Sequence, residues 1–174
     1  MITRVLFVCH GNICRSPMAE FILKDMVEKR GWKDRFEIAS AATSSEEIWG
    51  GRGNPVYPPA QAELKKHGIG KTPYTNFKNK RARQVTKADL RYYDYLLCAD
   101  TANIRNTIRI TGTDPEQKIR LLLDFAKEES HHGRSITDPW YSGDFVATYR
   151  DVVEGCEGFL AHLQQSGLIC CGKA

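Results

Sequence analysis

Apolar and polar positions are distributed along the chain in two ways, and each predicts one kind of element. Four short runs of apolar, β-branched and aromatic residues show little alternation, which is typical of strands covered on both faces. These runs span residues 4–9, 36–40, 93–98 and 118–123. Four other segments have helical spacing or helix-starting residues, at 16–31, 60–67, 100–110 and 143–165. Because strands and helices alternate, the sequence predicts an α/β fold: a single domain with a four-stranded parallel sheet and helices on both faces.

The last predicted helix is the longest, and it contains two glycines. Its apolar residues recur in steps of four and three, which indicates one buried face. They are Phe145, Tyr149, Val152, Cys156, Phe159 and Leu163. Gly155 and Gly158 cost about 1 kcal/mol each relative to Ala, so we expect tertiary packing to stabilise this helix. Residues 44–59 are rich in Gly, Pro and polar residues, and we expect a long loop there.

Composition narrows the class of protein. The chain has 174 residues, 41% hydrophobic and 26% charged, which favours one globular domain spanning residues 1–174 over a disordered chain. No apolar run is long enough to span a membrane, and the first residues lack the pattern of a secretory signal. Six cysteines are too few for a disulfide scaffold, so we expect reduced thiols and a cytoplasmic protein. The net charge of +4 does not indicate a nucleic-acid partner, and we expect none.

The segment between the first predicted strand and the first predicted helix combines residues suited to phosphate chemistry. Backbone N–H groups in such a loop form a cradle for an anion, and Ser16 is expected to cap the helix that follows. We expect Gly11 to adopt backbone angles that other residues avoid, while Asn12 tolerates left-handed geometry. Arg15 can bind two oxygens of one phosphate, and the same positive field favours the thiolate form of Cys9. One loop therefore supplies both a nucleophile and an oxyanion clamp.

The full string CHGNICRSP at residues 9–17 resembles the phosphate-binding loop of the low-molecular-weight protein tyrosine phosphatases. The resemblance covers nearly the whole chain. It includes SAA at residues 40–42, ARQVT at 82–86, DYLLCAD at 94–100 and DPWY at 138–141. It implies an enzyme with one α/β domain, no metal and no organic cofactor, which acts on phosphotyrosine in proteins or peptides.

The resemblance also assigns roles to residues. It implies that the Cys9 thiolate attacks phosphorus to form a phosphocysteine, that Arg15 holds the phosphate, and that Asp138 is the general acid and then the general base. Ser16 would donate to the thiolate, and Ser40 would help Asn12 to hold the loop in shape. The loop residues expected around the phosphate are His10, Gly11, Asn12, Ile13, Cys14 and Ser16. The expected walls of the substrate cleft are Trp140 and Tyr141, with Trp49 or Ile48 from the long loop.

Several positions leave more than one interpretation open. The family frequently has His where this chain has Lys80, which puts the network that supports the loop in doubt. Cys14 is either an unreactive neighbour of Cys9 or its partner in a reversible disulfide. Ile13 suits an aromatic leaving group, whereas relatives that prefer phosphoarginine carry Thr there. A basic run extends from residue 71 to residue 87; it is more simply a solvated loop than a site for anionic phosphopeptides.

Two other functions compete with a tyrosine phosphatase. An arsenate reductase built on the same loop needs two further cysteines that relay a disulfide. Cys98 falls inside a predicted strand, and the next cysteine is Cys156, so the required pair is not evident. A module that only binds phosphotyrosine would need neither Cys9 nor Asp138. Both alternatives are therefore weaker than the phosphatase.

Overall fold

The predicted parallel sheet is present in the computed structural model, which describes residues 1–169; Cys170 and Cys171 lie outside the described residues. The sheet has four strands in the order β2-β1-β5-β6, and all neighbouring strands are parallel. The strands are β1 (Thr3–Cys9), β2 (Phe36–Ala42), β5 (Tyr95–Cys98) and β6 (Ile119–Leu121). The predicted fold class is confirmed.

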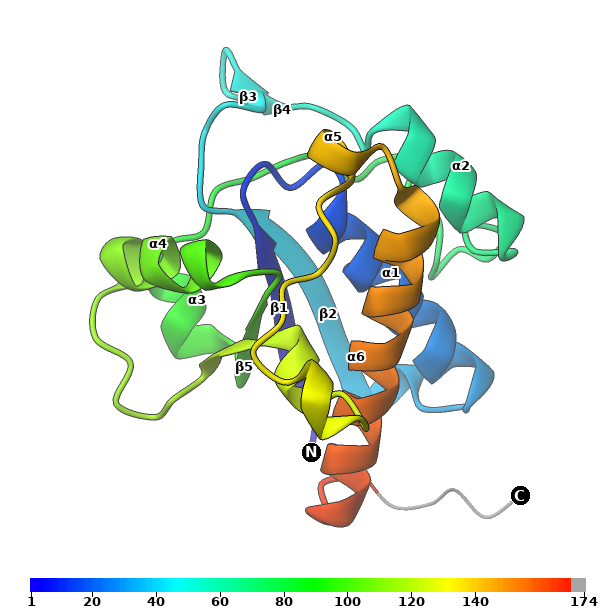
Figure 1. Ribbon diagram of the computed structural model, residues 1–174, viewed down its shortest axis with the longest axis vertical. Coiled ribbons are helices and arrows are strands. Elements are labelled where there is room, and N and C mark those ends of the chain that lie inside the picture. Colours follow the sequence, from blue (N-terminus) through cyan, green and yellow to red (C-terminus); the bar gives the residue numbers. More distant parts are fainter. Residues whose placement is uncertain (170–174) are drawn as a thin grey trace.

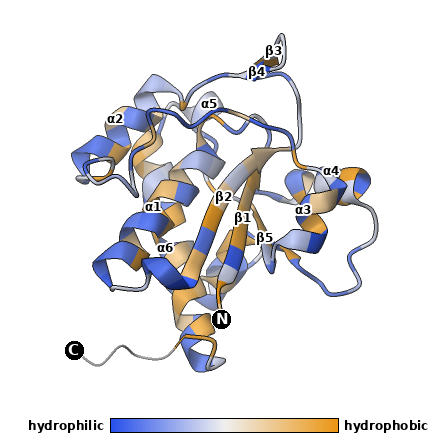
Figure 2. Cartoon of the chain, turned by 180° about the vertical axis from the view of Figure 1, so that it is seen from behind, coloured by the Kyte–Doolittle hydropathy of each residue, from blue (hydrophilic) through white to orange (hydrophobic). Residues whose placement is uncertain are grey.

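Helices cover both faces of the sheet, as Figure 1 shows. Helices α1 (Arg15–Lys29) and α6 (Phe145–Gln165) pack on one face, and α3 (Lys87–Tyr92) and α4 (Thr101–Thr111) lie on the other. Side chains of β1 alternate between two hydrophobic cores: Val5 and Phe7 join the first, and Leu6 and Val8 the second. The strands are accordingly mostly apolar, apart from charged residues such as Arg4 of β1 and Glu37 of β2, while the outer faces of the helices are polar (Figure 2).

The observed boundaries correct several predictions. The first helix starts at Arg15, and Ser16 does not cap it: residue 14 occupies the N-cap without a side-chain bond, and the Ser16 hydroxyl turns toward Cys9. The third strand starts at Tyr95. The fourth ends at Leu121, where the chain turns into the 3-10 helix η2 (Leu122–Phe125). The remaining elements are α2 (Pro58–Lys66), α5 (Pro139–Ser142), η1 (Lys33–Arg35) and η3 (Glu129–His131).

The segment 44–59 is not simply a loop. It contains a two-stranded antiparallel hairpin of β3 (Ile48–Trp49) and β4 (Arg52–Gly53). Gly50 and Gly51 form its turn with φ of 55° and 77°. A two-residue hairpin turn favours positive φ at both positions, and two successive glycines satisfy that requirement. The Gly-Gly pair was the sequence signal for this hairpin.

The two glycines of α6 allow an unusually close approach between α6 and η2. A Cβ at Gly155 would lie 2.5 Å from Cγ of Leu122, and one at Gly158 would lie 1.7 Å from the carbonyl oxygen of Phe125. Both positions therefore require glycine, and the contact compensates for their low helix propensity. The prediction that tertiary packing stabilises this helix is confirmed.

The strand order places a crevice beside the end of β1. The chain leaves β1 to build β2 on one side, and it later crosses to β5 on the other side. Connections that diverge in this way open a gap at the carboxyl ends of the strands, where ligands bind in open α/β sheets. Among residues 1–169, no helix has both the length and the apolar character needed to cross a bilayer.

Candidate active site

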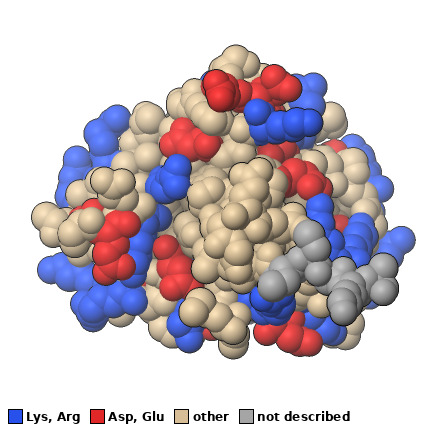
Figure 3. Space-filling view, turned by 90° about the horizontal axis from the view of Figure 1, so that it is seen from below, with Lys and Arg blue, Asp and Glu red and all other residues tan. Residues whose placement is uncertain are grey.

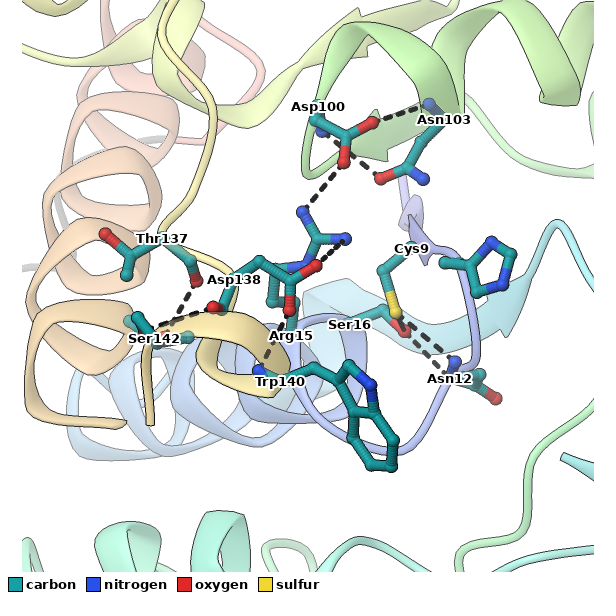
Figure 4. A network of polar contacts seen from close by, with 12 residues as sticks. Cys9, Asn12, Arg15, Ser16, Asp100, Asn103, Thr137, Asp138, Trp140 and Ser142 are labelled. Carbon is teal, nitrogen blue, oxygen red and sulfur yellow. Dashed lines mark hydrogen bonds and ion pairs between the residues drawn. The ribbon is translucent and has the colours of Figure 1, made fainter. Parts of the chain in front are cut away.

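A cleft of about 310 Å³ opens at the carboxyl end of β1. Cys9, Arg15 and Asp138 all line it, although Asp138 is 129 positions from Cys9 in the sequence. Cys9 comes from the end of β1, Arg15 from the first residue of α1, and Asp138 from the segment that leads into α5. The fold thus brings together the three residues with predicted catalytic roles (Figure 4).

The sulfur of Cys9 lies at the floor of this cleft, where only 3% of the residue is exposed. Its Sγ is 3.0 Å from Oγ of Ser16 and accepts a hydrogen bond from the backbone N–H of Asn12 at 3.3 Å. Figure 4 shows these groups converging on the sulfur. A hydroxyl and an amide that face a sulfur stabilise its negative form, which is the nucleophilic one.

Asn12 sets the shape of the loop. It has a φ of 59°, so the expected left-handed geometry is confirmed. Its Nδ2 donates to Oγ of Ser16 and to Oγ of Ser40, both at 2.8 Å. The expectation for Gly11 is wrong: its φ is not positive, and its role is to leave room for Glu47, whose Cγ would lie 3.1 Å from an added Cβ.

A buried ion pair continues this network below the loop. The Ser40 hydroxyl donates to Oε2 of Glu20 at 2.6 Å, and Nζ of Lys80 lies 3.1 Å from the same oxygen. Lys80 also donates to the carbonyl oxygen of Ser40 at 2.9 Å. Burial opposes ionisation of Glu20, but the charges of Lys80 and Lys24 outweigh it and hold the Glu20 pKa below its usual value. The network that supports the loop is therefore complete with Lys80 at the position where the family frequently has His.

Arg15 is 5% exposed and is held on two sides. Nη1 donates to Oδ2 of Asp100 at 2.8 Å, and Nη2 lies 3.1 Å from Oδ2 of Asp138. Burial alone would lower the Arg15 pKa, but the negative charges of Cys9, Asp138 and Asp100 raise it. The guanidinium is thus charged and fixed in orientation before any phosphate binds.

Asp100 is the residue of this site that the sequence did not identify. It is the first residue of the helix predicted at 100–110, and it caps α4: Oδ1 accepts from the backbone N–H of Asn103 at 2.7 Å. Its second oxygen holds Arg15, a contact made across 85 positions of sequence. An acidic residue directly after the strand next to β1 was the available signal, because the ends of adjacent parallel strands meet at one edge of the sheet.

The segment that carries Asp138 is tied to α6. The backbone N–H of Thr137 donates to Asp151 at 2.9 Å, and the Thr148 hydroxyl donates to the carbonyl oxygen of Thr137 at 2.8 Å. Asp138 itself caps α5 by accepting from the backbone N–H of Trp140 at 3.1 Å. These bonds fix the backbone next to Asp138 and hold its carboxylate beside Arg15.

The rim of the cleft is exposed and aromatic. Trp140 and Tyr141 line it, and Tyr141 is 87% exposed. The ring of Tyr57 packs against Trp140 with 5.9 Å between centroids. Trp49 does not line this cleft: it is 72% exposed on the β3–β4 hairpin, and Ile48 packs instead against the small core around Ile13. His10 lies at the mouth, 2.9 Å from Glu46.

The other cysteines differ from Cys9 in their surroundings. Burial, and then the charge of Cys9, raises the pKa of Cys14 to about 12, so Cys14 is a protonated thiol near neutral pH. Burial also raises the pKa of Cys98 to about 12 and that of Cys156 further, in agreement with their predicted place in the core. Cys9, Cys14, Cys98 and Cys156 are all free thiols in this structure. Within residues 1–169, no group of three or more His, Cys, Asp and Glu is placed to hold a metal ion.

The comparison with known families matches this arrangement to one of them. The model of the low molecular weight phosphotyrosine protein phosphatase family matches residues 4–168. The chain belongs to this family. The low molecular weight protein-tyrosine-phosphatase YfkJ of Bacillus subtilis is 35% identical over 92% of this chain and 96% of its own length. The low molecular weight phosphotyrosine protein phosphatase of Gallus gallus is 40% identical over 90% of this chain and 92% of its own.

Solved structures also resemble the chain over almost its full length. The crystal structure of YfkJ gives a TM-score of 0.83 at 34% identity and covers 95% of this chain and 97% of that one. The crystal structure of a Drosophila arginine phosphatase gives a TM-score of 0.75 at 33% identity, with 92% and 97% covered. The likeness therefore extends over the sheet, the helices and the cleft region together.

Proposed function

We propose that this chain hydrolyses phosphotyrosine monoesters in proteins or peptides through a phosphocysteine intermediate, and that residues 1–174 act as one cytoplasmic phosphatase domain. The observation that carries the proposal is that the thiol of Cys9, the guanidinium of Arg15 and the carboxylate of Asp138 line one cleft. Family membership supports the same reaction class.

The first step transfers the phosphoryl group to sulfur. The Cys9 thiolate attacks phosphorus, and the bond between phosphorus and the phenolic oxygen breaks. Arg15 and the backbone N–H groups of the loop bind the three equatorial oxygens as charge spreads over them. A phosphate oxygen replaces Asp138 as the partner of Nη2 of Arg15, which frees the Asp138 carboxyl to give a proton to the leaving phenolate.

The second step regenerates the thiolate. A water molecule attacks phosphorus while Asp138, now ionised, accepts a proton from that water. The bond between sulfur and phosphorus breaks, inorganic phosphate leaves, and the Ser16 hydroxyl and the Asn12 amide again stabilise the negative sulfur. The reaction consumes one water for each phosphate released and requires no change of oxidation state.

The walls of the cleft support an aromatic leaving group. Trp140 and Tyr141 provide rings at the rim, and Ile13 places an alkyl group in the lining. A phenyl ring packs on such surfaces. An arsenate reductase is less well supported, because it needs two further thiolates that relay a disulfide. Cys98 and Cys156 are fully buried, and burial raises the pKa of both thiols, so they are protonated near neutral pH.

The test is hydrolysis of a phosphotyrosine peptide by the purified protein without added metal. Phosphoserine, phosphoarginine and arsenate are assayed beside it. We expect Cys9→Ser to lower kcat by about 10³-fold or more while the protein still binds tungstate as an oxyanion. Cys156→Ala, which removes a remote thiol, is the matched control and should keep kcat. Undiminished turnover by Cys9→Ser would reject the mechanism, and faster turnover of phosphoarginine would reject the substrate.

A further inference from the structure

One face of α4 leads directly away from the cleft. Ala102 and Asn106 line the cleft at the start of this helix. With 3.6 residues per turn, Arg105 and Arg109 fall on the same stripe of the helix as Ala102 and Asn106. The seven helical steps from Ala102 to Arg109 span about 10 Å along the axis. Two arginines therefore follow the cleft mouth along one helix face.

A second pair of cations extends this surface. Helix α3 packs beside α4 and carries Lys87 and Arg91 four residues apart. These two residues and the two arginines of α4 are exposed, and none of the four forms an ion pair within residues 1–169. Lys and Arg side chains also gather on this side of the molecule in Figure 3, at the left, seen from the end opposite the cleft. We call Lys87, Arg91, Arg105 and Arg109 the basic surface.

Acidic side chains of the same region are already engaged elsewhere. Asp89 accepts from Nη1 and Nη2 of Arg83, both at 3.0 Å, and Asp100 binds Arg15. Asp94 and Asp114 accept hydrogen bonds from backbone N–H groups of Arg4, Lys118 and Ile119. The basic surface therefore has no acidic partner available from residues 83–114 and is free to attract one from another molecule.

The cleft lining also contains negative charge. Glu46 and Glu47 line the cleft together with Ala102 and Asn106 of α4. A peptide bound at the mouth therefore lies near carboxylates as well as near the arginines of α4. Complementary charges at such distances act mainly on specificity and on association rate.

The basic run of the sequence is not this surface. Lys71 and Lys78 border a different hollow beside α2, Lys80 is buried against Glu20, and Arg83 is paired with Asp89. Only Lys87 of the run joins the basic surface. Lys71 and Lys78 are exposed and form no ion pair within residues 1–169, so they serve as a matched control.

We propose that the basic surface selects substrates that carry acidic residues about three positions away from the phosphotyrosine. Three residues of extended peptide span about 10 Å, which matches the distance along α4 from the cleft mouth to Arg109. This inference rests on the proposed phosphatase activity and adds the part of the substrate beyond the phosphorylated ring. The occupant of the surface is the acidic flank of the bound protein substrate.

The test compares kcat/KM for phosphotyrosine peptides with Glu or Lys at the third and fourth positions, placed on either the N-terminal or the C-terminal side. The unaltered protein should prefer the acidic peptide of one series about five- to tenfold at low salt. Salt at about 0.5 M should remove most of that preference, because the charges are exposed. The double variant Arg105→Glu and Arg109→Glu should invert the preference for the acidic peptide. The double variant Arg105→Gln and Arg109→Gln (the Gln pair) should abolish this preference.

Three readouts separate the outcomes. Hydrolysis of a small aryl phosphate should stay within twofold in all these variants, because Arg105 and Arg109 do not line the cleft that holds it. The pair Lys71→Glu and Lys78→Glu changes net charge equally and should keep the preference for acidic peptides. Equal rates on acidic and basic peptides, or a preference unchanged by the Gln pair, would overturn the inference while leaving the phosphatase intact. Failure of the unaltered protein on the aryl phosphate and on every peptide would instead overturn both.

Discussion

The floor and the rim of the cleft are built on opposite principles. At the floor, the side chains around Cys9 are buried, and each polar group has a partner at a fixed distance: Ser16, Asn12 and Ser40 form one continuous network. At the rim, Trp140 and Tyr141 are exposed and lie on a short helix. Rigid groups suit a reacting dianion of constant shape, and exposed rings suit partners that vary.

This contrast separates chemistry from selectivity. Substitutions at the floor should change the rate constant for every substrate, because they move groups that touch the phosphate or the nucleophile. Substitutions at the rim should change which substrate is preferred and leave the intrinsic rate nearly intact. Four predictions, ordered by size of effect, test that division.

The largest effect is expected for Asp138→Asn, which keeps the shape of the side chain and removes its proton. We expect kcat on a phosphotyrosine peptide to fall about 10²- to 10³-fold, because the phenolate leaves without protonation. The loss should be smaller for p-nitrophenyl phosphate, whose leaving group needs little help. Stopped assays of released phosphate give both values. Asp124→Asn is the control, since Asp124 accepts from the Gly133 N–H in the same segment, and equal losses in both variants would contradict the role of Asp138.

The next effect is expected for Lys80→Met, because it leaves the carboxylate of Glu20 buried with one cation fewer. We expect the free energy of unfolding to fall by about 3 kcal/mol, and kcat to fall as Ser40 and Asn12 lose their support. Adding Glu20→Gln should restore much of the stability, because the buried charge is then gone. Urea unfolding measures this, with the exposed Lys71→Met as the control. No loss in Lys80→Met would show that the floor tolerates an incomplete network.

A pH dependence follows from the same pair. The pKa of Glu20 is lower in the folded protein than its usual value near 4.5, so its ionisation stabilises the fold above that pH. This stability is lost as the pH falls through the folded pKa. The unaltered protein should therefore lose more free energy of unfolding than Glu20→Gln between pH 5 and acid, measured by urea unfolding at each pH. Parallel losses in the two proteins would contradict the buried ion pair.

The smallest effect is expected for Trp49→Ala. The residue is 72% exposed and does not line the cleft, so kcat and KM for an aryl phosphate should stay within about twofold. Trp140→Ala should raise KM more, because Trp140 lines the cleft and packs against Tyr57. Steady-state kinetics on the same substrate compares the two. A larger change in Trp49→Ala than in Trp140→Ala would show that the hairpin reaches the substrate.

The sequence predicted what local physics determines. Periodicity of apolar residues located the strands and the long helices, and the residues around Asn12 predicted a loop with left-handed geometry. The sequence did not predict two short helices. These helices, α3 and α5, are six and four residues long, which is too short to show a hydrophobic period. The capping box between Thr86 and Asp89 was a usable signal for α3.

Contacts across long stretches of chain were beyond the sequence. Nothing local distinguishes Lys80 from the exposed lysines around it, and only the fold places it against Glu20, 60 positions away. The contact between Arg15 and Asp100 is of the same kind, because it depends on which strands are neighbours. Pairings of this type need the strand order, which alternation of elements does not determine.

The two oxygens of Asp100 join parts of the molecule that the division above treats as separate. One oxygen caps the N-terminus of α4, and the other orients the guanidinium of Arg15. A mutation that tilts the first turn of α4 to suit a new binding partner therefore also rotates the guanidinium of Arg15, which binds the phosphate. Redesign of substrate preference along this helix has to leave its first turn in place, or it will weaken the grip on phosphate for every substrate alike.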